Sequence, residues 1–374
     1  MDVANCGRGP TAFAVIIFSM IIQLTPADEY ACARALTRIA PYLPDESKST
    51  ALAIVHQIND PGARVRALCG LANSLPQEAK DAALPEALTI AHGISNAWLR
   101  VRALIGVSMS LPLDRAEDVR REAFATALTI QNEWQRGRAL RLLADLLPED
   151  LIDRAIAMTQ TIQDVQVRAL TLSSYAGHLP EKVVELLKAA PTMMDEWLRA
   201  SMLSSLAKYL PVDSIDRAAA IVRQINDPAP RVEALSSLAD HCSGQAKIDL
   251  LREAYASATS IEDDSARAET LIALIEHLPD EMKAAATRAA LAAARAAVDP
   301  EMRALLLTDL LGDVEENPGV LEKPGFFALL YEALNAARQI GQATSRAEAL
   351  SALLGHLSPD QRQIIVPEVL GLMV

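Results

Sequence analysis

The chain has 374 residues, of which 51% are hydrophobic and only 4% aromatic, so a large core would be built from Ala and Leu and would favour helices. Lys and Arg number 35 against 48 Asp and Glu, a net charge of -13. This balance argues against nucleic-acid binding, because a phosphate backbone would be repelled, and it would steer partners with basic surfaces.

The first apolar stretch is TAFAVIIFSMIIQL, residues 11–24. Its uninterrupted apolar part is shorter than the roughly 20 residues that span a bilayer, which argues against a membrane protein. The segment before it carries Asp2 and Arg8 and lacks the net positive charge of a signal peptide, although secretion stays an alternative. We expect residues 1–28 to form an atypical apolar helix that begins a single domain over residues 1–374.

A repeated segment reveals the organisation of the chain. INDPGARVRAL at residues 58–68 returns as INDPAPRVEAL at residues 225–235, and its arginine recurs at steps of 31 to 43 residues. We call this recurring position the origin of each repeat. The ten origins are Cys32, Arg64, Arg100, Arg136, Arg168, Arg199, Arg231, Arg267, Arg303 and Arg346. Leu follows every origin by four residues and further apolar residues follow by seven and eleven, which predicts one apolar stripe along a helix.

Each repeat also contains a second helix. The first helix stops at Leu-Pro in seven repeats, as at Pro44 and Pro76, and an Ala-rich helical segment follows. The 32- and 36-residue steps differ by about one helical turn in this second helix. The sequence therefore predicts an all-α fold, an α-solenoid of about ten two-helix repeats wound into a right-handed superhelix.

A helix-capping residue stands four positions before nearly every origin. These residues are Asp28, Asp60, Asn96, Asn132, Asp164, Asp195, Asp227, Asp263, Asp299 and Gln342. The origin arginine lies one turn inside the helix and on its apolar stripe, where an unpaired guanidinium would be costly. We expect a structural ladder in which each origin arginine pairs with the Asp or Asn cap of a neighbouring repeat. Direct ligand binding by these arginines is the alternative.

The unit R-x-x-A-L-x-x-L-A-x-x-L-P followed by an Ala-rich helix resembles the repeats of HEAT-like and TPR-like α-solenoids. It is also similar to the C-terminal helical arrays of bacterial STAND (NACHT/NB-ARC-type) NTPases. The proline after the first helix departs from the TPR pattern and favours a HEAT-like repeat. The STAND resemblance would imply ligand sensing or restraint of a nucleotide switch, but this chain lacks G-x-x-x-x-G-K-[ST].

The last step between origins contains an insertion, for which we expect a loop at residues 312–326 between the helices of the ninth repeat. Its segment GDVEENPGV, residues 312–320, resembles the end of viral 2A peptides, which cause ribosomal skipping. Val320 replaces the final proline of that motif, so we interpret Asn317–Gly319 as a turn signal.

The sequence predicts no enzyme, no metal site and no cofactor. It contains no H-E-x-x-H, no G-x-S-x-G and no Gly-rich phosphate loop. Four histidines share the position ten residues after the origin: His178, His241, His277 and His356. Stacked repeats would hold them about 10 Å apart, too far to share a metal. The cysteines Cys6, Cys32, Cys69 and Cys242 have no C-x-x-C spacing and indicate reduced thiols in the cytoplasm.

Two further positions are candidates for partner binding. Two residues before the origin lies an aromatic column: Tyr30, Trp98, Trp134 and Trp197. Two residues after the origin lies a charge column: Arg34, Arg66, Arg102, Arg138, Leu170, Ser201, Glu233, Glu269, Leu305 and Glu348. The sign of the charge reverses along the chain, which would orient an extended partner. Packing is the alternative for the aromatic residues, and a solvated face is the alternative for the charged ones.

We therefore expect a cytoplasmic, non-enzymatic scaffold or adaptor that binds an unidentified protein or peptide. The alternatives are a ligand-sensing or autoinhibitory array of a STAND-like system, and an enzyme on a HEAT-like frame of the DNA glycosylase or bilin lyase type. Residues 11–24 and the C-terminal IIVPEVLGLMV are both apolar. We expect a homodimer through one of these ends, unless a further domain covers the first helix.

Overall fold

The computed structural model describes residues 26–316 and 323–372. These residues form twenty α-helices, α2 to α21, joined by turns and short 3₁₀ segments, and none of them lies in a strand. The predicted all-α class is confirmed. The chain divides into two compact units, one formed by Met1–Ala116 together with Leu334–Val374 and the other by Glu117–Ala333.

The helices pack as ten consecutive pairs. The first helix of each pair, here the A helix, is α2 (Pro26–Ile39), α4 (Pro61–Ala72), α6 (Ala97–Ser108), α8 (Glu133–Leu143), α10 (Val165–Ser173), α12 (Glu196–Ala207), α14 (Pro228–Ala239), α16 (Asp264–Ile275), α18 (Pro300–Glu316) or α20 (Ala343–Ala352). The second, the B helix, is α3 (Asp45–Gln57), α5 (Gln77–Gly93), α7 (Leu113–Leu128), α9 (Glu149–Gln160), α11 (Val183–Ala189), α13 (Ile215–Val222), α15 (Gly244–Thr259), α17 (Asp280–Ala296), α19 (Lys323–Gln339) or α21 (Pro359–Leu372).

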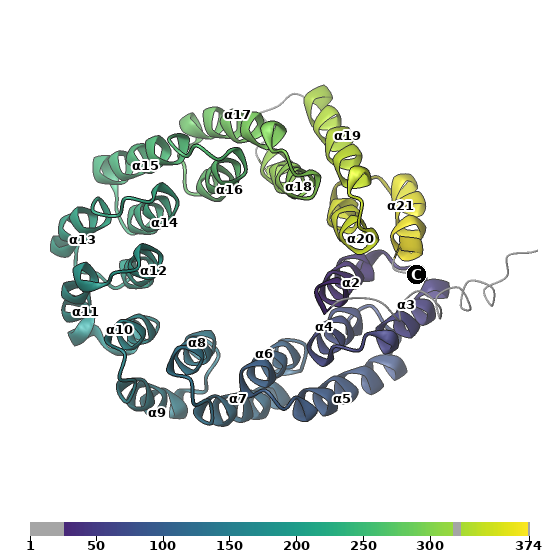
Figure 1. Cartoon of the computed structure of the whole chain (residues 1–374), viewed down its shortest axis with the longest axis horizontal. Coiled ribbons are helices and arrows are strands. Elements are labelled where there is room, and N and C mark those ends of the chain that lie inside the picture. The colour runs from purple at the N-terminus through teal and green to yellow at the C-terminus, as the bar shows by residue number, and fades with distance from the viewer. Residues whose placement is uncertain (1–25, 317–322, 373–374) are drawn as a thin grey trace, which may run out of the picture. The chain divides into compact units, whose positions relative to one another are not determined.

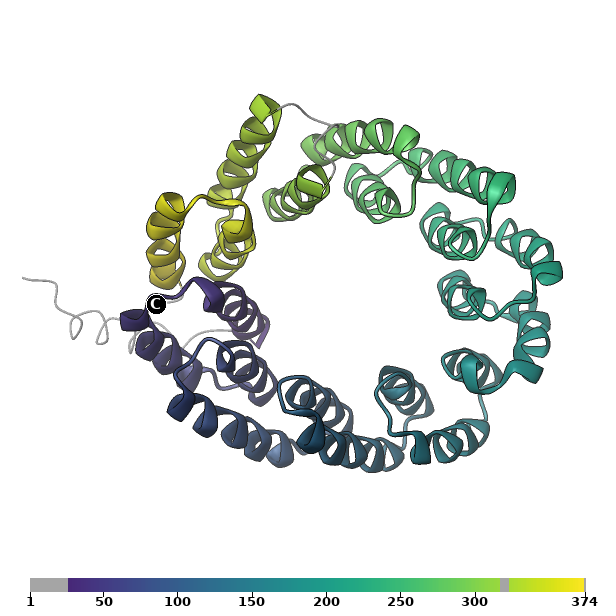
Figure 2. The same cartoon turned by 180° about the vertical axis from the view of Figure 1, so that it is seen from behind.

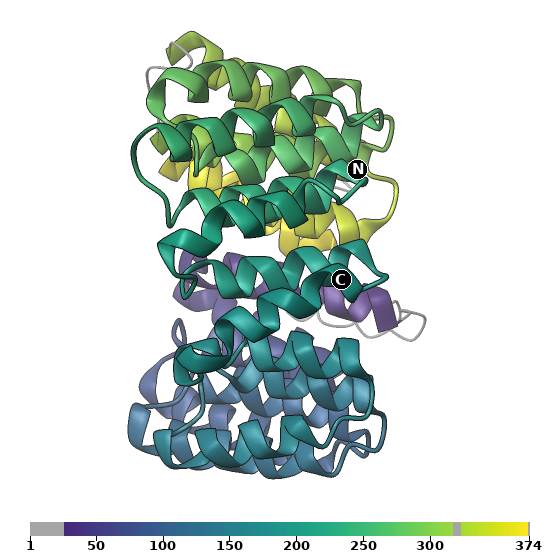
Figure 3. The ribbon, with the colours of Figure 1, turned by 90° about the vertical axis from the view of Figure 1, so that its left-hand side faces the viewer.

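Within each unit the A helices form one layer and the B helices form another (Figures 1 and 2). In unit 2 neighbouring helices lie side by side (Figure 3). The leucine four residues after each origin is buried between the layers, as Leu68, Leu104 and Leu235 illustrate with no exposed area. The apolar stripe predicted from the sequence is thus the contact surface of the A helices.

The two repeat lengths differ in the B helix, as predicted. The 32-residue step that begins at Cys32 contains α3, which has 13 residues. The 36-residue step that begins at Arg64 contains α5, which has 17 residues. The difference is close to one helical turn, so the extra residues lengthen the helix and leave its buried face in place. Pro44 and Pro76 occupy the N-cap positions of these two helices.

The caps of the A helices are confirmed from the second to the ninth repeat. Asp60, for example, accepts a hydrogen bond from Ala63 N at 2.7 Å, and Asn96 accepts one from Leu99 N at 3.0 Å. The same bond is made by the remaining cap residues: Asn132, Asp164, Asp195, Asp227, Asp263 and Asp299. These side chains satisfy backbone N–H groups that a helix leaves without an internal partner.

The predicted pairing of the origin arginines with neighbouring caps is wrong. Arg64 Nε instead donates to Ile58 O at 2.8 Å, and Arg100 Nε donates to Ile94 O at 2.7 Å. Each acceptor lies six residues back, at the end of the preceding B helix, where carbonyl groups lack an intrahelical partner. The equivalent bond is made by Arg136, Arg168, Arg199, Arg231, Arg267 and Arg346. The cap carboxylates are already used by their own helices, so the guanidinium takes the unsatisfied carbonyl.

Glutamates one residue after the cap position connect successive repeats. Glu133 accepts hydrogen bonds from Gln163 N at 3.0 Å and Asp164 N at 3.1 Å, in the turn of the next repeat. Glu196 does the same with Asn226 N and Asp227 N, and Glu29 with Asn59 N and Asp60 N. The bonds to backbone N–H groups lower the pKa of Glu133 and of Glu196.

Both sequence segments singled out as irregular extend beyond the described residues. Residues 1–25 lie outside them, and Pro26 already begins α2. Helix α18 continues to Glu316 and α19 begins at Lys323, so both ends of the expected loop at 312–326 are helical. The turn at Asn317–Gly319 lies outside the described residues. Part of the apolar C-terminal stretch lies in α21, where it buries Ile365, Val366 and Val369.

Replacing an origin arginine should destabilise the protein. Arg231 donates to Ile225 O and to Ser257 Oγ, both at 3.0 Å, so Arg231→Ala removes two partly buried hydrogen bonds. We expect a loss of about 1–3 kcal/mol in the free energy of unfolding, measured by urea denaturation. Arg217→Ala, an exposed arginine on α13, is the matched control and should change stability by less than about 0.5 kcal/mol. Equal effects would contradict the assignment.

Two glycines at the same repeat position should respond differently to alanine. A Cβ at Gly70 would lie 2.7 Å from Cβ of Thr37, whereas one at Gly106 would meet nothing within 4 Å. Gly70→Ala should therefore lower stability by about 1–3 kcal/mol through overpacking between α4 and α2. Gly106→Ala should raise it by up to about 1 kcal/mol through helix propensity. Thermal unfolding of both variants checks the opposite signs.

Candidate functional site

The aromatic and charge columns lie on the same face of the A helices, because offsets of -2 and +2 are one helical turn apart. The guanidinium of Arg102 lies over the ring of Trp98, 5.9 Å from its centroid, in unit 1. Arg138 lies over Trp134 at 5.6 Å in unit 2. In the sequence, the aromatic column and the charge column are two separate patterns. The structure joins them into cation–π pairs, each combining an aromatic surface with a positive charge.

The tryptophans of unit 2 are accessible to solvent. Trp134 is 49% exposed and Trp197 is 53% exposed, although Trp is among the residues that gain most from burial. Neither ring is therefore enclosed at a helix junction, and Trp98 is half-buried. Exposed tryptophan beside arginine is the composition that dominates the energetic centres of protein interfaces.

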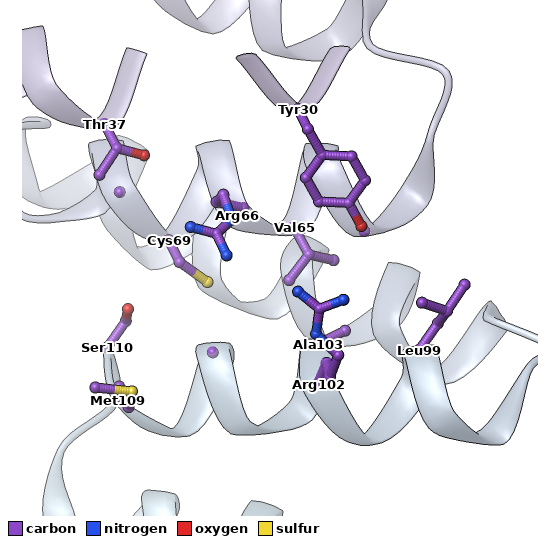
Figure 4. Close-up of a pocket in the computed structure, with 13 residues that line it drawn as sticks. Tyr30, Thr37, Val65, Arg66, Cys69, Leu99, Arg102, Ala103, Met109 and Ser110 are labelled. Carbon is purple, nitrogen blue, oxygen red and sulfur yellow. The ribbon is translucent and has the colours of Figure 1, made fainter. Parts of the chain in front are cut away.

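Unit 1 contains a pocket of about 360 Å³ between α2, α4 and α6. Tyr30 lines it from α2, Arg66 from α4 and Arg102 from α6, and the two guanidinium groups point into the same space (Figure 4). Val65 and Leu99 provide apolar walls. The pocket thus unites three members of the aromatic and charge columns that stand 36 residues apart in the sequence.

Glycines make room for this pocket. Gly62 stands at the -2 position, which holds an aromatic residue in four other repeats, and a Cβ there would lie 2.3 Å from Oη of Tyr30. A larger residue would displace the Tyr30 ring. On the other side, Gly106 lines the pocket, and a Cβ there would contact nothing within 4 Å. Because Gly62 and Gly106 have no side chains, space for the pocket remains between the helices. The repeat pattern of the sequence does not predict this space.

The pocket's other ionisable groups are neutral. Burial, with the charge of Asp60, raises the pKa of Tyr30, whose hydroxyl is hydrogen-bonded to the Asp60 carboxylate. Burial raises the pKa of Cys69 to about 11, so this thiol stays protonated at neutral pH. A protonated thiol is a poor nucleophile. The formal charge of the lining therefore comes from Arg66 and Arg102, and no Asp or Glu is among the described residues that line the pocket.

Three arginines on or next to the B helices instead form ion pairs with carboxylates. On the B helices Arg223 pairs with Glu253 at 2.9 Å, Arg295 with Glu332 at 2.8 Å and Arg338 with Glu368 at 2.9 Å. Each pair joins neighbouring B helices. Neither Arg66 nor Arg102 has a carboxylate at ion-pair distance among the residues that the structure describes. Their charge is available for an external anion.

The acidic part of the charge column lies in unit 2 and is mixed in character. Glu233 and Glu269 are exposed, Ser201 and Leu305 are half-buried, and Leu170 is buried in the core. Arg141 donates to Ser201 Oγ at 3.2 Å. Burial lowers the pKa of Arg141. Partial desolvation by the surrounding protein raises the pKa of Glu233, although the residue is still exposed, and the nearby charge of Arg141 opposes this effect. In unit 2 the exposed carboxylates of the column are thus separated by buried and half-buried residues, as the uncharged members at Leu170, Ser201 and Leu305 indicate.

Arg34 and Glu348, at the two ends of the charge column, pair with each other inside unit 1. Glu348 is buried and accepts a bidentate pair of hydrogen bonds from Arg34, with Nη2 to Oε2 at 2.6 Å. Gln342, which precedes α20, and Thr344 in α20 donate to Asp28 of α2. Asp28 thus lies inside the first turn of α2 instead of before it, and Gln342 makes no side-chain cap bond to α20. These residues hold α2 against α20, the A helices of the first and last repeats.

The four histidines of the column do not come together as a metal site in the part of the chain that the structure describes. His277 Nδ1 lies 2.8 Å from Oδ2 of Asp240 in the preceding repeat. Within residues 26–316 and 323–372, no group of three or more His, Cys, Asp or Glu side chains is placed to hold a metal ion. Cys32 is buried like Cys69, and its pKa is raised to about 12.

Compared with known proteins, the chain matches no protein-family model and no curated protein sequence. None of the helices in the described part of the chain is long and apolar enough to cross a membrane.

Neutralising Glu348 should weaken the contact between α2 and α20. Glu348→Gln loses the charge-assisted bonds to Arg34, and because Arg34 is 42% exposed, the loss is reduced by solvent to about 1–2 kcal/mol. Urea denaturation measures this difference. Glu269→Gln changes the exposed equivalent residue in α16 and should stay within about 0.5 kcal/mol of the wild type. A similar stability for both variants would show that the Arg34 pair contributes nothing.

Proposed function

We propose that this protein is a non-enzymatic interaction scaffold, a right-handed α-solenoid of HEAT-like repeats that binds an acidic segment of a partner protein. The observation that carries the proposal is the pairing of accessible tryptophan with arginine on the A helices, in Trp98–Arg102 and Trp134–Arg138. Trp197, two repeats after Trp134 in unit 2, is a further exposed tryptophan of the aromatic column.

The chemistry of these pairs favours a protein ligand with negative charge. Tryptophan and arginine contribute more binding energy at interfaces than other residue types, because they bury large surfaces and still make polar contacts. The guanidinium also lies on the ring, so it loses less side-chain freedom when an acidic group binds. The overall charge of -13 would steer basic partners, but the A-helix surface around Arg66 and Arg102 is locally positive.

The proposal includes a cytoplasmic location, which the buried, protonated thiols of Cys32 and Cys69 support. The proposal also includes a homodimer that forms through the apolar N-terminal or C-terminal segment. The sensor role in a STAND-like system would use the same surface, and it stays a prediction from the resemblance alone.

Intrinsic fluorescence offers a direct test, because all three tryptophans of the chain belong to the aromatic column. An acidic peptide with interspersed leucines should change the emission of the wild type in a saturable way. Charge reversal at Arg66, Arg102 and Arg138 to Glu should weaken binding at least a hundredfold, and raised salt should weaken wild-type binding.

The control reverses three exposed arginines on B helices, Arg217, Arg252 and Arg288, and gives the same net charge. This variant should bind the acidic peptide like the wild type. Equal affinities of the two triple variants would contradict the assignment of the surface. A saturable fluorescence change with a basic peptide, and none with the acidic one, would contradict the assignment of the partner's charge.

A further inference from the structure

We infer that the pocket between α2, α4 and α6 binds a phosphoryl group carried by a side chain of the partner. The inference rests on the proposed function for the source of that group, a phosphorylated protein segment. The pocket itself is argued from its own charge, size and lining.

The charge of the pocket matches a dianion. Arg66 and Arg102 supply two positive charges, and the lining contains no carboxylate among the described residues. Asp60, which contacts the lining residue Tyr30, already accepts from Ala63 N and from the Tyr30 hydroxyl. A carboxylate would neutralise one guanidinium and leave the other uncompensated, whereas a phosphoryl group carries about -1.5 to -2 charges at neutral pH.

The donors of the pocket also fit phosphate oxygens. Arg66 and Arg102 occupy the same position in successive repeats, and their guanidinium groups approach the same space from α4 and α6 (Figure 4). Each guanidinium presents a planar fork of N–H donors that binds two oxygens at once. The stacking of Arg102 on Trp98 restricts one of the two side chains before any ligand binds.

The volume of the pocket is sufficient for a phosphorylated side chain. About 360 Å³ lies at the lower end of the range of roughly 300–1,000 Å³ for small-molecule sites. The Tyr30 ring, Val65 and Leu99 would contact the carbon part of a phosphorylated side chain. Met109, which is 72% exposed at the rim, would contact the residue next to it.

A second pocket of unit 1, between α3 and α21, lacks these properties. Its arginine, Arg362, donates to Leu354 O at 2.8 Å and stacks on Tyr42 at 4.6 Å. That guanidinium is committed to the fold, so the phosphoryl group is assigned to the pocket of Arg66 and Arg102.

Titration calorimetry with N-acetyl phosphotyrosine amide and N-acetyl phosphoserine amide tests the inference. Inorganic phosphate and N-acetyl glutamate amide serve as further probes. At least one phosphoamino acid should bind more tightly than inorganic phosphate and at least tenfold more tightly than glutamate. Its affinity should fall between pH 7.5 and 5.5, because the second phosphate ionisation has a pKa near 6.

Three variants locate the site. Arg66→Gln and Arg102→Gln should each weaken phosphoamino-acid binding at least tenfold. Gly106→Leu should do the same by filling the pocket while both arginines remain, and the open space at Gly106 allows this variant to fold. Arg138→Gln and Arg217→Gln, each with the same change of charge elsewhere, should bind like the wild type.

Three results would overturn the inference: glutamate binding as tightly as the phosphoamino acids, inorganic phosphate binding better than both of them, or unchanged binding by Gly106→Leu with a native melting curve. The experiments distinguish a failure of the proposed phosphoryl site from a failure of the proposed acidic-peptide binding. Binding of the unphosphorylated acidic peptide depends on Arg138 and not on Gly106, whereas phosphoryl binding depends on Gly106 and not on Arg138.

Discussion

The bond from an origin arginine to the end of the preceding B helix is the interaction that recurs through most of this structure. Eight of the ten repeats make it, in each case to the carbonyl six residues back, as Arg64 does with Ile58. A helix end must find partners for its last carbonyls, and a cation near that end also offsets the helix dipole. The arginine thereby ties the first turns of each A helix to the end of the B helix before it.

The first and last repeats differ from the others in their origin or cap residue, and their A helices contact each other. Cys32 replaces the arginine in the first repeat, and Gln342 replaces the acidic cap in the last. Asp28 accepts from Gln342 and Thr344, and Arg34 pairs with the buried Glu348. Some residues at which the first and last repeats deviate from the repeat pattern therefore have a different structural role. They form the polar contact between α2 and α20, where a repeat would otherwise leave an apolar helix face uncovered.

The candidate site depends on the same repetition. Identical offsets place Arg66 and Arg102 side by side on neighbouring A helices, so a single charged position becomes a two-arginine pocket. The surface differs from parts of the B-helix face, where acidic residues of the next repeat pair with Arg223, Arg295 and Arg338. The repeated residues specify the packing of the helices. At the exposed positions, the presence or absence of a carboxylate opposite an arginine decides whether that arginine forms an intramolecular ion pair or can bind a ligand.

The sequence by itself determined the helical class, the repeat boundaries, the caps such as Asp60 and the extra turn of α5, because these follow from local spacing and from interactions within a few residues. It also identified the aromatic and charge columns. Only the tertiary structure decided that Arg64 binds Ile58 O, that Glu348 is buried against Arg34, and that Gly62 and Gly106 leave a pocket. Those outcomes depend on which groups on separate helices compete for the same partner and the same space, and one-dimensional spacing contains no such information.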